Sequence, residues 1–167
     1  MTEKEFLDAV SNGGDDIIEQ FLGHLKKARA RYCVIGGLAV NAYAEPVVSL
    51  DLDVVVVADA LDRFLSLAGR RLKIRRFAPS INLTAARSDL RIQIQTNPRY
   101  LDFIPRSSRR RVLGYSMRVA SLDDVFQGKL WAYADTRRRR SKRQKDLADM
   151  YRLAEAYPRL RRLLPKV

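Results

Sequence analysis

The sequence that decides the fold reads Gly36-Gly37-Leu38-Ala39-Val40-Asn41-Ala42-Tyr43 and then Ser49-Leu50-Asp51-Leu52-Asp53-Val54-Val55-Val56-Val57. The first stretch is a glycine pair before a short helix-like segment, and backbone without side chains can approach phosphates closely. In the second stretch, two aspartates alternate with apolar residues at the start of a predicted strand. Side chains two positions apart on a strand share a face, so both carboxylates can reach one cation. Asp51 and Asp53 therefore predict a Mg²⁺ site that serves substrate phosphates.

Length and composition indicate a globular protein. The chain has 167 residues, of which 47% are hydrophobic, enough for one domain with a core of its own. No apolar run is long enough to cross a bilayer, and the N-terminus begins Thr2-Glu3-Lys4-Glu5, unlike a signal peptide. The single cysteine, Cys33, excludes an internal disulfide and lies among apolar residues, which favours a buried strand thiol. We therefore expect a cytoplasmic protein without a membrane partner.

The charge is strongly basic. Lysine and arginine total 32 against 19 acidic residues, which gives a net charge of +13. The basic residues are concentrated in 137–145, in a group at Arg106 and 109–111, and in 70–76. Such a field favours a polyanionic partner, for which RNA is the first expectation, although a solvated basic face without any polyanion is the alternative.

Apolar periodicity and turn residues predict the order of the elements. Helices are expected at 15–29 and 38–44, around 61–67 before Gly69, from Ser121 onward, and at 141–157. Strands are expected at 31–35, 51–57, 72–77, 81–85 and 90–95, with one further strand over 111–120 interrupted at Gly114. Ser121 has the side chain of a good N-cap. The pattern predicts an α/β fold with a mixed, partly antiparallel sheet in 31–120 and C-terminal helices in 121–158, within a single domain over 1–167.

Lys129 interrupts the apolar stripe of the helix that follows Ser121. A lysine directed at a core requires either a route by which its head reaches solvent or a negatively charged partner. It could instead direct its ammonium into a cleft where phosphate charge develops, as phosphoryl transfer requires. The sequence leaves both interpretations open.

Two aspartates lie on the last predicted helix. Asp146 borders its buried face, one turn before Met150, and its proximity to the Lys129 helix makes a functional role as good an interpretation as a structural one. For Asp149 the preferred interpretation is an acidic side chain that answers the helix dipole. The chain has one histidine, His24, so a histidine-based metal cluster or catalytic triad has no second member, and a packing or surface role is expected for it.

The order of motifs resembles that of the AbiEii-type nucleotidyltransferases, a group that includes toxins of toxin–antitoxin systems within the DNA polymerase β-like superfamily. The resemblance covers the glycine pair, Asp51-Leu52-Asp53, Lys129-Leu130-Trp131-Ala132 and Arg143-Gln144-Lys145-Asp146. It implies a nucleotidyltransferase-like mixed sheet flanked by helices. No Gly-x-Gly-x-x-Gly follows a predicted strand and no P-loop is present, so those phosphate-binding motifs are excluded.

The resemblance also implies roles for individual residues. Asp51 and Asp53 would chelate Mg²⁺ and through it the β- and γ-phosphates of an NTP. Lys129 would neutralise phosphate charge, and Asp146 would complete the catalytic group. The triphosphate would be contacted by Gly36, Gly37 and Ser49, and Arg143 and Lys145 would contact phosphates or the acceptor.

One departure from the superfamily pattern concerns a third carboxylate on a later strand. The counterpart strand presents Gln93 and Gln95, whose neutral amide oxygens are poor metal ligands and cannot accept a proton, and Asp89 only at its beginning. Either Asp146 supplies the missing acid or turnover is lost. The expected function is Mg²⁺-dependent transfer of a nucleoside monophosphate from an NTP to RNA, such as tRNA, or to a protein, in a toxin-like role with a cognate antitoxin. The alternative is a catalytically degenerate module that binds nucleotide or RNA.

Overall fold

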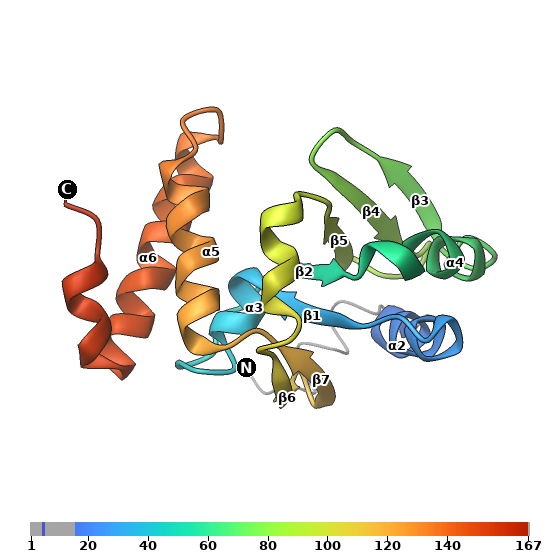
Figure 1. Cartoon of the computed structure of the whole chain (residues 1–167), viewed down its shortest axis with the longest axis horizontal. Coiled ribbons are helices and arrows are strands. Elements are labelled where there is room, and N and C mark those ends of the chain that lie inside the picture. Colours follow the sequence, from blue (N-terminus) through green and yellow to red (C-terminus); the bar gives the residue numbers. More distant parts are fainter. Residues whose placement is uncertain (1–4, 6–15, 167) are drawn as a thin grey trace.

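The fold is a seven-stranded mixed sheet flanked by helices, as predicted from sequence (Figure 1). The computed structural model describes Glu5 and residues 16–166. The strands are β1 (Tyr32–Ile35), β2 (Asp51–Val56), β3 (Lys73–Arg76), β4 (Ser80–Thr84), β5 (Arg91–Gln95), β6 (Ser108–Val112) and β7 (Tyr115–Val119), in the order β3-β4-β5-β2-β1-β7-β6. Pairs β2–β5 and β1–β7 are parallel, and the remaining neighbours are antiparallel.

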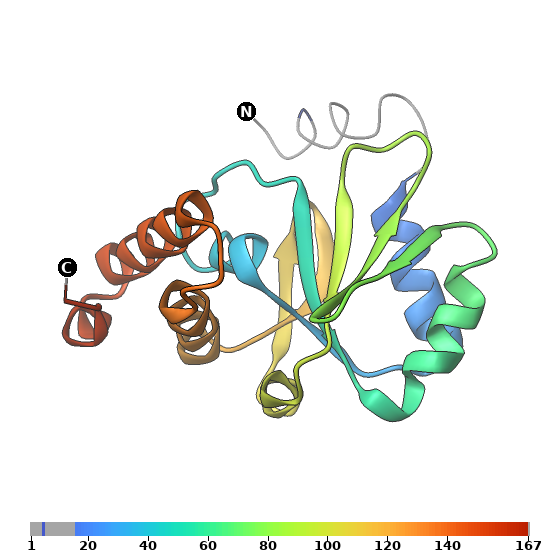
Figure 2. The same ribbon diagram turned by 90° about the horizontal axis from the view of Figure 1, so that it is seen from above.

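Helices lie on both sides of the sheet. Figure 2 shows α2 (Ile17–Ala28) and α4 (Ala58–Ala68) together on one side, and α3 (Gly36–Val40), α5 (Leu122–Ala134) and α6 (Arg140–Ala156) on the other. Two 3₁₀-helices that the sequence did not predict, η1 (Pro98–Phe103) and η2 (Pro158–Leu163), each begin at a proline. The predicted N-cap is confirmed, because the Ser121 side chain accepts a hydrogen bond from the backbone N–H of Asp124 at 3.2 Å.

The register of the central strands brings the functional side chains together. Strand β2 lies between β1 and β5, and Asp53 is opposite Ile35 on one side and Gln93 on the other. Asp51 is opposite Arg91. Because side chains alternate along a strand, Asp51, Asp53 and Gln93 share one face of the sheet. The valines that follow in β2, Val54, Val55 and Val56, are buried, as befits a strand with neighbours on both sides.

Two sequence-based expectations need correction. Residues 111–120 do not form one interrupted strand, because β6 and β7 are an antiparallel hairpin with Val112 paired to Tyr115. Its two-residue turn, Leu113 and Gly114, has φ values of 52° and 81°, the positive values that a tight hairpin turn requires. The short helix α3 begins at Gly36 rather than at Leu38.

The core runs through the sheet and both helical layers, with Phe21, Phe64 and Leu38 among its fully buried side chains. Cys33 is part of this core, as expected, and burial raises the pKa of its thiol to about 12. Across the part of the chain that is described, no helix is both long enough and apolar enough to cross a membrane.

Candidate active site

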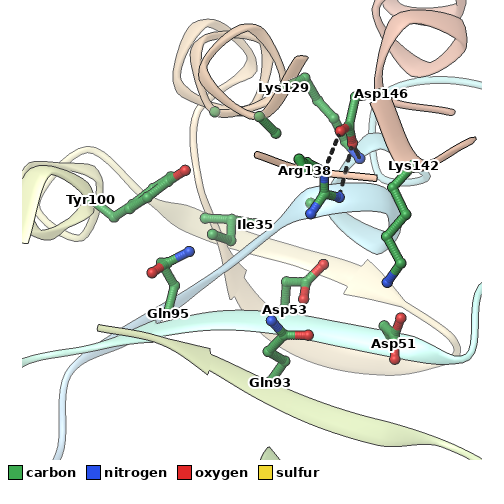
Figure 3. Close-up of a pocket in the computed structure, with 13 residues that line it drawn as sticks. Ile35, Asp51, Asp53, Gln93, Gln95, Tyr100, Lys129, Arg138, Lys142 and Asp146 are labelled. Atoms are coloured by element: carbon green, nitrogen blue, oxygen red, sulfur yellow. Dashed lines mark hydrogen bonds and ion pairs between the residues drawn. The ribbon is translucent and has the colours of Figure 1, made fainter. Parts of the chain in front are cut away.

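A cleft opens beside β2 and β5 on the side of the sheet that carries α5 and α6 (Figure 3). Five of the residues predicted from sequence line it: Gly36, Asp51, Asp53, Lys129 and Asp146. These residues come from four separate elements, so the fold brings together motifs that are far apart in the chain. Gln93, Gln95 and Tyr100 also line the cleft, as do Arg138 and Lys142.

The Asp53 carboxylate differs from the other carboxylates of the cleft in its surroundings. Its side chain is half-buried, and within residues 16–166 it accepts no hydrogen bond and forms no ion pair. Burial raises the pKa of Asp53, and the charge of Asp51 raises it further, while Lys129 opposes the shift. A carboxylate that is desolvated, close to a second carboxylate and without a protein partner is a site that a cation would stabilise.

Asp51 is held in place from the neighbouring strand. Arg91 Nε donates to Asp51 Oδ1 at 2.9 Å, across the register pair that joins β2 to β5. One oxygen of Asp51 is therefore committed to this arginine, and the carboxylate retains acceptor capacity for a metal. Two carboxylates on one face of β2 fit a Mg²⁺ ion, which binds through one or two protein carboxylates plus phosphate and water oxygens.

Gly36 has a steric role beside Asp53. Its φ is +73°, and a Cβ at this position would lie 2.4 Å from Asp53 Oδ2 and 3.0 Å from Asp53 Cβ. Only glycine fits between the end of β1 and this carboxylate. Gly37 is less constrained, because its Cβ would meet Ser49 Oγ at 3.7 Å, an ordinary contact.

Gly37 and Ser49 are not among the residues that line the cleft. Ser49 is buried, and its hydroxyl donates to the carbonyl of Asp51 at 3.3 Å and accepts from the Asp51 N–H at 3.4 Å. The hydroxyl thus braces the turn that leads into β2. In this conformation Ser49 positions Asp51 through the backbone.

Lys129 is buried between two carboxylates of α6. Its side chain is 8% exposed, which excludes the interpretation of a lysine whose head reaches solvent. Lys129 Nζ lies 3.1 Å from Asp146 Oδ1 and 2.8 Å from Asp149 Oδ2. Burial alone would lower the pKa of Lys129, but Asp149 and Asp146 outweigh it and raise the pKa above its usual value. The lysine is therefore a fixed positive charge beside Asp53.

The dipole interpretation of Asp149 is wrong. Helix α6 begins at Arg140, so Asp149 lies well beyond the first turn, and it is buried against Lys129. On its other side, Arg152 Nη1 lies 2.8 Å from Asp149 Oδ1. The second amino group of Arg152 donates to Asn41 Oδ1 at 2.9 Å, which links α6 to the segment that leads to Ser49.

Asp146 is buried and paired on both oxygens. Besides the Lys129 contact, Arg138 Nε donates to Asp146 Oδ2 at 2.7 Å (Figure 3). Both oxygens of Asp146 are thus engaged by cations that come from two different segments of the chain. In this arrangement Asp146 is suited to positioning Lys129 and Arg138.

The basic residues at the cleft differ from those predicted. Arg143 does not line the cleft: its Nε donates to the carbonyl of Tyr133 at 2.7 Å, which fastens α6 to the end of α5. Lys145 is exposed and also does not line the cleft. Arg138 and Lys142 do, and Figure 3 shows the Lys142 side chain extending toward Asp51 and Asp53. The sequence signal for Lys142 was its spacing of one helical turn from Asp146, which places both on one face.

The position of a third carboxylate is occupied by Gln93, the register partner of Asp53. Among the described residues, no group of three or more acidic, histidine or cysteine side chains could hold a metal ion. Asp89 is exposed and precedes β5. The cleft therefore combines three carboxylates, of which Asp51 and Asp53 share one face of the sheet, with two glutamines and three cationic side chains.

With this geometry established, comparison with known proteins decides the family. Residues 19–166 match the family described as "Nucleotidyl transferase AbiEii toxin, Type IV TA system". The chain belongs to this family of nucleotidyltransferases. The resemblance identified from the motifs is thereby confirmed.

Solved structures show the same fold at low identity. The antibiotic-resistance factor ANT(2'')-Ia in complex with adenylyl-2"-tobramycin superposes with a TM-score of 0.59 at 14% identity, covering 89% of this chain and 94% of that one. A putative nucleotidyltransferase from Thermotoga maritima superposes with a TM-score of 0.57 at 16% identity, covering 78% of this chain and 86% of that one. A nucleotidyltransferase-like protein from Paracoccidioides brasiliensis superposes with a TM-score of 0.56 at 16% identity, covering 93% of this chain and 78% of that one. No curated protein sequence gives a significant match.

Proposed function

We propose that this AbiEii-family chain transfers a nucleoside monophosphate from an NTP to an RNA acceptor and depends on Mg²⁺ held by Asp51 and Asp53. The observation that carries the proposal is the Asp53 carboxylate, which is desolvated beside Asp51 and has no protein partner within residues 16–166. In the reaction the oxygen of an acceptor hydroxyl bonds to the α-phosphorus of the NTP, the bond from that phosphorus to the α–β bridging oxygen breaks, pyrophosphate leaves, and the hydroxyl proton passes to solvent. Bound Mg²⁺ would neutralise and orient the phosphates.

The remaining cleft residues have complementary roles in this proposal. Lys129 supplies a fixed charge beside the phosphates, and Asp146 and Asp149 hold its ammonium in place. Lys142 and Arg138, which line the cleft, would contact the phosphates or the acceptor, the role that the family resemblance implied for Arg143 and Lys145. Gly36 leaves room for Asp53, and Gly37 and Ser49 shape the turn next to the triphosphate.

The acceptor is assigned by charge. A net charge of +13 with basic clusters on several elements supports a polyanionic acceptor over a neutral one, and RNA such as tRNA is the proposal, with a protein as the second candidate. The family description supports a toxin-like role, and a cognate antitoxin would be its partner.

A specific observation favours one alternative function. Gln93 replaces a carboxylate directly opposite Asp53, and both oxygens of Asp146 are already paired. A degenerate member of the fold would then bind nucleotide or RNA without turnover. It predicts binding that survives removal of metal and loss of Asp53.

The test is label transfer from each of the four α-labelled NTPs to total RNA and to protein, with and without Mg²⁺. The wild type should label RNA only with Mg²⁺, and Asp53→Asn should abolish labelling while it leaves the fold intact. Asp59→Asn, on the exposed first turn of α4, is the matched control and should label as the wild type does.

Metal binding is measured separately, by the shift of the melting temperature on addition of Mg²⁺. The wild type should be stabilised and Asp53→Asn should not, because the ion binds only the folded carboxylate pair. Equal labelling by wild type and Asp53→Asn would exclude the proposed reaction. Absence of labelling together with metal-independent RNA binding would establish the degenerate alternative.

A further inference from the structure

We propose that Arg99, Tyr100 and Trp131, together with Gln95, form a subsite for the single-stranded end of the acceptor RNA. This inference rests on the proposed function, because it assigns the acceptor side of the same cleft. The subsite is an arginine–aromatic platform that continues the cleft away from Asp51 and Lys142.

The aromatic rings form a rigid cluster between η1 and α5. Tyr100 and Phe103 are three residues apart in a 3₁₀-helix, so both project from one face of η1. The Phe103 ring is stacked on Trp131 with an interplanar angle of 7° and a centroid separation of 5.6 Å. Tyr100 meets Trp131 edge to face at 5.2 Å. Phe103 and Tyr100 are buried, whereas Trp131 is half-exposed, so the indole is the part of the cluster that solvent reaches.

Arg99 is held over this cluster without an acidic partner. Its guanidinium carbon lies 4.5 Å from the Trp131 ring centroid and 5.2 Å from that of Tyr100. The side chain is exposed, and in the described part of the chain no carboxylate forms an ion pair with it. Arg106 differs, because its Nε lies 2.8 Å from Asp124 Oδ2. Arg99 is therefore a positioned cation that remains available to a phosphate.

The platform is continuous with the catalytic cleft. Tyr100 and Gln95 line the cleft, and Figure 3 shows them at the end opposite Lys142 and Asp51. Gln95 Oε1 accepts the backbone N–H of Asn97 at 3.1 Å. Only the oxygen can accept that bond, so the amide nitrogen is the group that Gln95 presents to the cleft, where it can donate to a base or a ribose.

This combination fits an RNA strand better than the other ligands of the cleft. A single strand presents base faces that stack on aromatic and guanidinium planes and phosphates that pair with arginine. The phosphates of an NTP are expected at the other end, with Asp51, Lys142 and the metal. A protein acceptor would not require both a stacking plane and an arginine that has no carboxylate partner.

Trp131 allows a direct test, since it is the only tryptophan of the chain. Its fluorescence is followed during titration with a short unstructured oligonucleotide, without NTP or Mg²⁺. We expect quenching of the wild type, a steep dependence on salt, and an affinity about tenfold lower for Arg99→Ala, as is typical when a stacking or phosphate contact is lost. Arg99→Lys, which keeps the charge but not the planar stack, should be intermediate.

The matched control is Arg31→Ala. Arg31 is exposed, precedes β1 at the end opposite the cleft-lining Ile35, and lies outside the three basic groups, so its loss should leave oligonucleotide affinity close to that of the wild type. Equal affinities of wild type and Arg99→Ala, or quenching by NTP but not by oligonucleotide, would overturn the inference. If label transfer to RNA occurs but its KM for RNA is unchanged in Arg99→Ala, this subsite is wrong while the proposed function stands. If the oligonucleotide binds at Trp131 but no nucleoside monophosphate is transferred from any NTP, the subsite stands and the proposed reaction is wrong.

Discussion

Asp149 Oδ2 lies 2.8 Å from Lys129 Nζ, and this contact joins the middle of α6 to the middle of α5 beside the cleft. Asp149 also forms an ion pair with Arg152. Lys129 also contacts Asp146, which in turn forms an ion pair with Arg138. Because every member is paired, the arrangement satisfies buried charges that would otherwise be costly. It also couples the position of Lys129 to the packing of the two helices.

Loss of Asp149 should therefore destabilise the protein strongly. Asp149→Ala leaves the buried ammonium of Lys129 with Asp146 as its one carboxylate partner. Removal of one partner from a buried ion pair typically costs about 3–5 kcal/mol. Urea denaturation at neutral pH measures the change. Asp123→Ala, which removes the exposed partner of Arg159, is the control and should unfold as the wild type does. Equal stability of the two variants would mean that the Lys129–Asp149 contact contributes nothing.

The two glycines at the end of β1 should respond differently to alanine. In Gly36→Ala the new methyl group would collide with Asp53, and the positive φ adds about 1–2 kcal/mol of strain. We expect a melting temperature that is lower than that of the wild type and a Mg²⁺-induced stabilisation that is reduced or absent. Gly37→Ala should keep a melting temperature and a Mg²⁺-induced stabilisation close to those of the wild type, because its methyl group makes only ordinary van der Waals contacts. Similar losses in the two variants would contradict a specific fit between Gly36 and Asp53.

Lys142 rather than Lys145 should contact the nucleotide. Lys142→Ala removes a cation that lines the cleft, and we expect KM for the NTP to rise about tenfold, the scale of one lost charge-assisted contact to phosphate. Lys145→Ala removes the same charge three residues away, on an exposed side chain, and should change KM little. The comparison keeps net charge equal in both variants. A larger effect at Lys145 would restore the assignment made from sequence.

How much the sequence predicts depends on whether a feature is local. The shared face of Asp51 and Asp53 follows from strand alternation alone and was predictable, and so was the N-cap of Ser121. The hairpin turn at Leu113 was missed because leucine at positive φ is uncommon and the Asn-Gly signal of such turns is absent.

The site was predictable only in part, for a similar reason. The burial of Asp149 depends on Lys129 from another helix, which no local pattern of α6 reveals. Which basic residues of 137–145 face the cleft depends on the start of α6 at Arg140, because one residue of phase rotates a side chain by about 100° around the helix. The sequence could identify the basic run and not the orientation of its members.

The last prediction concerns the glutamine opposite Asp53. Gln93→Glu places a third carboxylate on the face that carries Asp51 and Asp53, and like charges across a register pair destabilise a sheet by about 0.2–1 kcal/mol. Without metal the variant should therefore melt below the wild type. With Mg²⁺ the same charge becomes a ligand, so the metal-induced rise in melting temperature should exceed that of the wild type.

Gln95→Glu is the matched control for this variant. Its register partner on β2 is Val55, so the added charge lies farther from Asp51 and should change metal binding less. Label transfer distinguishes the two proposed functions. If Gln93→Glu gains transfer that the wild type lacks, the native glutamine is what prevents turnover, because a carboxylate can accept the proton of the attacking hydroxyl and an amide cannot. If the wild type already transfers label and Gln93→Glu does not improve it, two carboxylates suffice for this cleft.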